Sequence, residues 1–118
     1  MQPAFGVIGL GRMAQALVVP LLERGLVPAD QLFAVVGGSG SLEQRRGALP
    51  AGIGLVAVDD PAAQLVWRAP VQLLAVKPQQ LDAVAAAAGP VEGKPLLISV
   101  LAGVSLARLQ HLFPGHRC

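Results

Sequence analysis

The part of the sequence that decides the fold stands near the start of the chain: Phe5-Gly6-Val7-Ile8-Gly9-Leu10-Gly11-Arg12-Met13-Ala14. A short apolar run, typical of a buried strand, ends in the pattern Gly-x-Gly-x-x-Ala and leads directly into a helical pattern. Gly9 permits the tight turn, Gly11 lets a pyrophosphate approach the backbone, and Ala14 lets the helix pack close to its strand. Backbone N–H groups and the positive end of a helix meet a phosphate at such a turn. The stretch therefore indicates a dinucleotide-binding turn, with a purely structural tight turn as the alternative.

The composition favours one densely packed α/β domain. Hydrophobic residues make up 53% of the 118 residues and charged residues only 14%, which favours a buried core over disorder. Aromatic residues make up 3%, so Val, Leu, Ile and Ala must fill the interior, as they do in buried parallel strands. We therefore expect a single domain over residues 1–118.

Charge and cysteine usage argue against several other classes of protein. The net charge is only +2 and Arg45-Arg46 is the one adjacent basic pair, so we expect no nucleic-acid surface. A single cysteine, Cys118, cannot form an internal disulfide, which favours a reducing cytoplasm. The N-terminus lacks a secretory pattern, and the longest apolar run, around Leu96–Leu101, is far shorter than the roughly 18 residues of a membrane span. We expect a cytoplasmic protein without a membrane partner.

Apolar runs and helical patterns alternate along the chain. The predicted strands are Phe5–Ile8, Leu32–Val36, Gly54–Val58, Val71–Val76 and Leu96–Leu101. The predicted helices are Arg12–Arg24, Ser41–Arg46, the segment from Asp60-Pro61 to about Arg68, Gln79–Ala88 and Leu106–Phe113. This alternation predicts a Rossmann-like, doubly wound parallel sheet with the strand order 3-2-1-4-5.

Local signals set the ends of these helices. Gly25 is a good residue to end the first helix, and Pro20 is expected to kink it because proline lacks an N–H group. Asp60 is a typical N-cap, and the ring of Pro61 suits the first helical position. Ser105 is expected to cap the last helix in the same way.

The strand order predicts where a ligand binds. In such a sheet the ligand lies beside the carboxyl ends of the two strands at which the order reverses, here the first and the fourth. Those ends carry Gly9–Ala14 and Ala75–Pro78, so we expect both segments to meet in one crevice.

The segment after the second strand bears on the choice of dinucleotide. NAD-binding proteins place a carboxylate there to bind the ribose 2′-hydroxyl, whereas this chain has Gly37-Gly38-Ser39-Gly40-Ser41. Ser39 and Ser41 can donate hydrogen bonds to a 2′-phosphate, and Arg45 or Arg46 can supply charge. We therefore predict NADP (as NADPH) rather than NAD; a solvated loop is the alternative interpretation.

Three blocks of sequence resemble pyrroline-5-carboxylate reductase. They are Gly6–Leu17, Leu74-Ala75-Val76-Lys77-Pro78-Gln79 and Ile98-Ser99-Val100-Leu101-Ala102-Gly103-Val104-Ser105. The resemblance covers essentially the whole chain but only the N-terminal half of the family's protein. It implies an oxidoreductase that transfers hydride from NADPH to the C=N carbon of 1-pyrroline-5-carboxylate, giving proline in the last step of proline biosynthesis.

The resemblance also implies partners for this half. Family members continue into another strand, which His116-Arg117-Cys118 would begin, and then into a helical domain that forms the dimer and much of the imino-acid pocket. The full-length form is thus expected to be a homo-oligomer. We expect the 118-residue chain alone to bind NADP weakly and to be inactive.

The reaction makes modest demands on side chains. A protonated imine is already electrophilic, so the protein mainly aligns the nicotinamide and excludes water. We predict no catalytic side chain and no metal; Lys77 is either solvated or a cation beside an anionic substrate. Together with Ser39, the resemblance gives these cofactor-binding residues: Ile8, Gly9, Leu10, Gly11, Arg12, Met13, Ala75, Val76, Lys77, Pro78, Val100 and Ala102.

Two other functions stay open. One is another NADP-dependent two-domain dehydrogenase of the 3-hydroxyacid type, and the other is a non-catalytic, NADP-binding regulatory module. The family's asparagine near the adenine-side ribose corresponds to Asp59-Asp60 here, and Asp60 is explained either as a helix N-cap or as a ligand to that ribose. His111 and His116 are interpreted as surface residues.

Overall fold

The chain folds around one parallel sheet in the computed structural model, which describes residues 4–9, 12–37, 52–58, 60–89, 91, 93–100 and 103–118, with only the backbone at 12 and 13. Every ladder is parallel, and the strand order β3-β2-β1-β4-β5 confirms the prediction of a Rossmann-like fold. The strands are β1 (Phe5–Ile8), β2 (Leu32–Val36), β3 (Gly54–Ala57), β4 (Val71–Leu74) and β5 (Leu96–Ser99).

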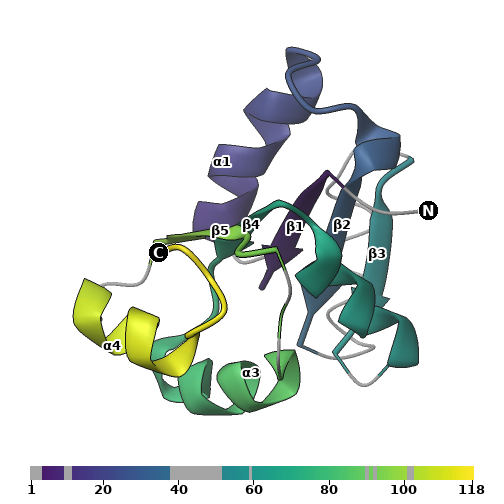
Figure 1. The fold of residues 1–118 in the computed structure, drawn as a ribbon. Helices are drawn as coiled ribbons and strands as arrows, with labels where there is room; N and C mark the ends of the chain where they lie inside the picture. The colour runs from purple at the N-terminus through teal and green to yellow at the C-terminus, as the bar shows by residue number, and fades with distance from the viewer. Residues whose placement is uncertain are drawn as a thin grey trace.

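Helices cover both faces of this sheet (Figure 1). The helical segments are α1 (Arg12–Glu23), η1 (Ala29–Gln31), η2 (Pro61–Arg68), η3 (Pro78–Gln80), α3 (Leu81–Ala88) and α4 (Leu106–Leu112). Helix α1 packs on one face, and η2, α3 and α4 pack on the other. The predicted helix Ser41–Arg46 lies outside the described residues.

Strands β4 and β5 are shorter than predicted. The ladder between β1 and β4 ends at the pair Ile8–Leu74, because the chain turns away from the sheet at Gly9. Leu74 pairs with Ser99 in turn, so β5 stops at the same level. A strand cannot continue its ladder beyond the end of its partner, and apolarity alone does not show where the partner ends.

The helix predicted from Pro61 to about Arg68 is present, and it is a 3-10 helix. Eight residues span about 16 Å as a 3-10 helix and about 12 Å as an α-helix. The tighter winding thus suits a short connection that must return from the carboxyl end of β3 to the amino end of β4.

The predicted helix ends are confirmed. The Asp60 carboxylate accepts the Ala62 N–H at 2.9 Å, and the Ser105 hydroxyl accepts the Arg108 N–H at 3.1 Å. After α1, the N–H groups of Gly25 and Leu26 donate back to the last turn, which is the usual way to satisfy its free carbonyls. Pro20 lies within α1, and the kink there stays a prediction.

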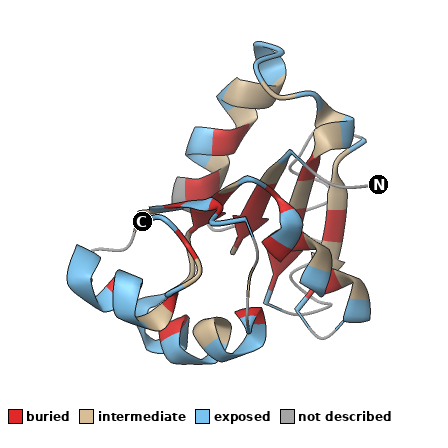
Figure 2. Ribbon diagram, in the orientation of Figure 1, coloured by how far each residue is buried: buried red, intermediate tan, exposed pale blue. Residues whose placement is uncertain are grey.

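Alternate residues of the strands fill two cores, one on each face, as expected for a parallel sheet buried on both sides. Val7 and Leu73 pack beneath α1, together with Ala14 and Val18 of that helix. On the opposite face the core is formed by Ile8, Val35, Leu74 and Leu97 with residues from η2, α3 and α4. Figure 2 shows the buried residues along the strands and the inner sides of the helices.

Gly6 lets η2 approach this sheet closely. A Cβ atom at Gly6 would lie 2.8 Å from the carbonyl oxygen of Val66 and 2.9 Å from its Cγ2 atom. Neither contact is possible for a real side chain, so the position of η2 depends on the absence of a side chain in the middle of β1.

A buried polar network corrects the prediction that His116 is a surface residue. Gln72 is fully buried, and its Nε2 group donates to the carbonyls of Trp67 and Ala69, both at 3.0 Å. Both amide hydrogens are thereby used, so Gln72 Oε1 accepts from Nε2 of His116 at 2.8 Å. His116 is only 4% exposed, with its ring edge-on to Phe113, because the tail after α4 folds back beneath the sheet.

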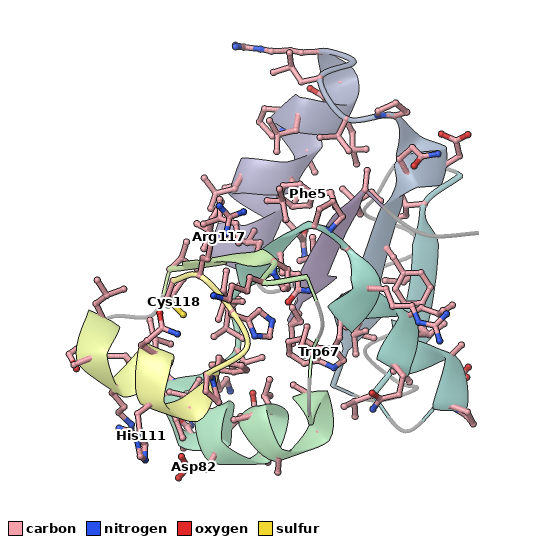
Figure 3. The ribbon with its side chains drawn as sticks, in the orientation of Figure 1. Phe5, Trp67, Asp82, His111, Arg117 and Cys118 are labelled. Atoms are coloured by element: carbon pink, nitrogen blue, oxygen red, sulfur yellow. The ribbon has the colours of Figure 1, made fainter. Side chains whose placement is uncertain are left out.

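The C-terminal segment lies beside β5. Arg117 forms an isolated parallel bridge with Leu96, and its carbonyl accepts the Leu97 N–H at 2.7 Å, where a further strand is predicted to begin. His111 is exposed on α4 and points away from the sheet (Figure 3).

No helix in the described part of the chain is long and apolar enough to cross a membrane.

We expect Gly6→Ala to lower the free energy of unfolding by about 1–3 kcal/mol, because the new methyl group overlaps the backbone of Val66. Urea denaturation measures this. Gly37→Ala is the matched control, since a Cβ there meets no atom within 4 Å and should leave stability nearly unchanged. Equal stability of the two variants would contradict the close packing of η2.

We expect the free energy of unfolding to decrease at low pH because His116 is buried. Burial lowers the pKa of His116 from 6.5, so the folded state favours the neutral ring. Its contribution is complete above pH 6.5 and is lost as the pH falls below that value toward the lowered folded pKa. Free energies of unfolding at about pH 7.5 and about pH 5 should therefore differ less in His116→Gln than in the wild type. His111→Gln should keep the wild-type difference, and a wild-type slope in His116→Gln would refute this account.

Candidate functional site

The corners after β1 and β4 touch each other at the carboxyl edge of the sheet. Gly9 has a φ of +86°, and a Cβ atom there would lie 2.8 Å from the carbonyl oxygen of Ala75 and 3.0 Å from the nitrogen of Val76. Both the backbone conformation and the contact require glycine. The two segments therefore meet where the strand order reverses, as the sequence predicts.

We call the two corners in contact, at Gly9 and at Ala75–Pro78, the junction. Much of the backbone at and beside the junction is already hydrogen-bonded within the protein. The Gly9 N–H donates to the carbonyl of Val35 (2.9 Å), and the Ala75 N–H donates to the carbonyl of Ile8 (2.8 Å). The Lys77 N–H donates to Gln80 Oε1 (3.3 Å), and the Val100 N–H donates to the carbonyl of Leu74 (3.2 Å). These N–H groups hold the corners together, so they are not donors to a ligand.

The start of α1 supplies the donors that the junction lacks. The first N–H groups of an α-helix, here from Arg12 onward, have no partner within the helix, and the dipole of α1 adds positive potential. Ala14 is fully buried against the sheet, so the helix begins close to the corner at Gly9. A phosphate group would be held at this first turn.

A cavity of about 380 Å³ lies beside the junction, on the face that carries η2 and α3. The ends of β1, β2 and β3 form one side of it, and η2, η3 and α3 form the rest. Its volume is within the range of about 300–1,000 Å³ that is typical of small-molecule sites. The lining is mainly apolar, including Trp67 of η2, and contains no charged side chain among the described residues. Figure 3 shows Trp67 between the sheet and α3.

Among the described residues that line the cavity, three have polar side chains, and all three are amides: Gln64, Gln79 and Gln80. Gln64 Nε2 donates to the carbonyl of Ala87 at 3.1 Å and so joins η2 to α3. Gln80 Oε1 accepts the Lys77 N–H. An apolar slot with neutral amides at its edge suits an uncharged, flat, polar-edged group.

The structure brings together some of the predicted site residues. Ile8, Gly9 and Val76 line the cavity, and Ala75 contacts Gly9. The side chains of Lys77 and Pro78 are exposed at η3. Val100 is half-buried against the core beneath α1, away from the cavity. The remaining predictions fall on Leu10, Gly11, Ser39 and Ala102, outside the described residues, and on the undescribed side chains of Arg12 and Met13.

Sequence reasoning missed the wall of the cavity. Gln64 and Trp67 stand three residues apart on η2, a spacing that puts them on one side of a 3-10 helix. Gln79 and Gln80 directly follow the predicted segment Ala75–Pro78. These glutamines were a usable signal, because amides concentrated at a predicted ligand corner are candidates for contact with the ligand.

Among the residues that the structure describes, no three His, Cys, Asp or Glu side chains are grouped so that they could hold an ion.

Two known proteins are similar to this chain in sequence over most of its length. A pyrroline-5-carboxylate reductase of Synechocystis is 40% identical over 113 residues, which are 94% of this chain and 40% of that protein. One from Haemophilus influenzae is 36% identical over 109 residues, or 92% of this chain and 38% of that protein. The chain thus spans about two fifths of the length of these relatives. The resemblance inferred from the three sequence blocks is confirmed.

Solved structures share the fold. A pyrroline-5-carboxylate reductase from Coxiella burnetii matches 95% of this chain and 40% of its own with a TM-score of 0.71 and 24% identity. The Plasmodium falciparum pyrroline carboxylate reductase, determined with NADP bound, also gives 0.71, at 19% identity, over 95% of this chain and 38% of its own.

A family profile gives the widest assignment. Residues 4–103 match the family described as NADP oxidoreductase, coenzyme F420-dependent. This match covers most of the chain, including both corners and the residues that line the cavity beside them. The chain therefore belongs to the NADP oxidoreductase, coenzyme F420-dependent family.

Proposed function

We propose that residues 1–118 are the NADPH-binding unit of an enzyme that reduces 1-pyrroline-5-carboxylate to proline. The observation that carries the proposal is the contact between Gly9 and Ala75 beside the cavity, at the point where the strand order reverses. The relatives named pyrroline-5-carboxylate reductase support the choice of reaction.

The site suggests how the dinucleotide lies. Its phosphates belong at the first turn of α1, where the N–H groups of Arg12, Met13 and Ala14 have no acceptor within the helix. The cavity on the side of β2 and β3 suits the adenine, because it is apolar and holds no charged described side chain. The nicotinamide then lies on the other side of Gly9, toward the ends of β4 and β5, near Ala75–Pro78 and Val100.

The protein contributes positioning rather than acid–base chemistry in this proposal. Bound NADPH supplies the hydride. The corner at Gly9 is rigid, because its N–H group is bonded to Val35 and its backbone touches Ala75. A rigid, mostly apolar edge fixes the orientation of a bound ring and excludes water, which are the main requirements for reduction of an imine.

We also retain the preference for NADPH over NADH. Strand β2 ends at Val36 and is followed by the exposed Gly37, so no carboxylate stands at the first position after the strand. The donors proposed for the 2′-phosphate, Ser39 with Arg45 or Arg46, lie outside the described residues.

The cellular location and the oligomeric state of the enzyme are also proposed. We propose a cytoplasmic homo-oligomer that uses neither nucleic acid nor membrane, formed through parts of a longer protein. The small net charge of +2 and the single cysteine of the chain support it.

We expect Ala83→Phe to weaken NADPH binding at least about tenfold, or about 1.4 kcal/mol, because a phenyl ring on α3 enters the cavity. Ala83 is exposed, so the fold should tolerate the change. Binding is measured by quenching of Trp67, the only tryptophan of the chain. Ala86→Phe is the matched control on the same helix, since Ala86 is exposed but does not line the cavity. Equal affinities of the two variants would place the dinucleotide elsewhere.

The reaction itself is testable in a chimera in which this chain replaces the matching 113 residues of the Synechocystis reductase. We expect oxidation of NADPH that depends on 1-pyrroline-5-carboxylate, with a lower kcat/KM for NADH. Ala83→Phe within the chimera should raise the KM for NADPH about tenfold and change kcat less. A folded chimera that binds NADPH without reducing the imine would disprove the proposed reaction.

A further inference from the structure

The amide of Gln64 has a fixed orientation at the edge of the cavity. Its Nε2 group donates to the carbonyl of Ala87, one of the last carbonyls of α3, which have no donor within the helix. If the amide were flipped, Oε1 would face that carbonyl and two acceptors would oppose each other. The carbonyl of Ala87 therefore decides which end of the Gln64 amide is oxygen and which is nitrogen.

This orientation leaves a defined pair of groups on the amide. One N–H is used by Ala87, and no other described residue bonds this amide, so the second N–H serves as a donor and Oε1 as an acceptor. A glutamine amide with one donor and one acceptor pairs in two places with adenine, whose amino group donates and whose neighbouring ring nitrogen accepts. Hypoxanthine carries an oxygen in place of that amino group, so Gln64 Oε1 would meet another acceptor.

The other two glutamines of the cavity lack this property. Gln80 already uses its Oε1 to accept the Lys77 N–H, so its acceptor is occupied. Gln79 is exposed, and no hydrogen bond to the described residues fixes its amide. An amide that is free to flip offers either pattern and does not discriminate between bases. Gln64 alone among the described polar lining residues combines an available pair of groups with a fixed orientation.

We propose that Gln64 is a specificity-determining residue that selects adenine over other purines in the bound dinucleotide. The inference rests on the proposed function, since it assumes that the base of the cofactor enters this cavity. It adds a role for a residue of η2, which lines the cavity but is distant in the sequence from the first turn of α1.

The test compares the dissociation constants of NADPH and of its analogue with hypoxanthine in place of adenine, measured by quenching of Trp67. The wild-type chain should prefer NADPH about tenfold, as expected for one two-point amide contact at a partly exposed site. Gln64→Leu keeps the size of the side chain but removes both groups, so the ratio of the two constants should approach one.

Gln79→Leu is the matched control, because it removes an amide from the same cavity and should keep the wild-type ratio. A wild-type ratio near one, or an unchanged ratio in Gln64→Leu, would overturn the role of Gln64 while NADPH binding itself stands. A ratio near one in Gln79→Leu, with the wild-type ratio kept in Gln64→Leu, would show that Gln79 rather than Gln64 selects the base. A wild-type chain that binds neither dinucleotide contradicts the proposed function, and this inference falls with it.

Discussion

The close contact between the backbone at Gly9 and the carbonyl of Ala75 is the constraint on which the rest of the structure depends. A side chain at Gly9 would lie within 2.8 Å of that carbonyl, and the Gly9 N–H also bonds to Val35 at the end of β2. One residue thus ties together the ends of β2, β1 and β4. The position of α1, the opening of the cavity and the lengths of β4 and β5 all follow from where this turn occurs.

The same constraint separates the parts of the site that are rigid from the parts that are available. The Gly9 N–H is bonded to β2 and the Ala75 N–H to β1, so the corners form a frame rather than a set of ligand donors. The groups proposed to meet a ligand lie elsewhere, at the first turn of α1, whose first N–H groups have no acceptor within the helix, and on the amides around the cavity. A stable frame with a few available polar groups is the usual construction of a cofactor site.

The C-terminal residues after α4 pack against η2, which forms one wall of the cavity. Trp67, which lines the cavity, lies 6.1 Å from Phe113 and 5.8 Å from His116 between ring centres. Gln72 of β4 joins His116 to the carbonyl of Trp67. Residues after α4 therefore stabilise the site from the opposite side of η2, although they are distant from the glycine turn in the sequence.

The strand order, the turn at Gly9 and the caps at Asp60 and Ser105 could be predicted from the amino-acid sequence, because these features depend on local patterns of apolar residues, glycine and short polar side chains. Only the tertiary structure decided that His116 is buried and that Gln64 faces a cavity with its amide held by Ala87. Those properties depend on contacts between segments more than 20 residues apart, such as the pairing of His116 with Gln72, and no local pattern encodes which side chains meet.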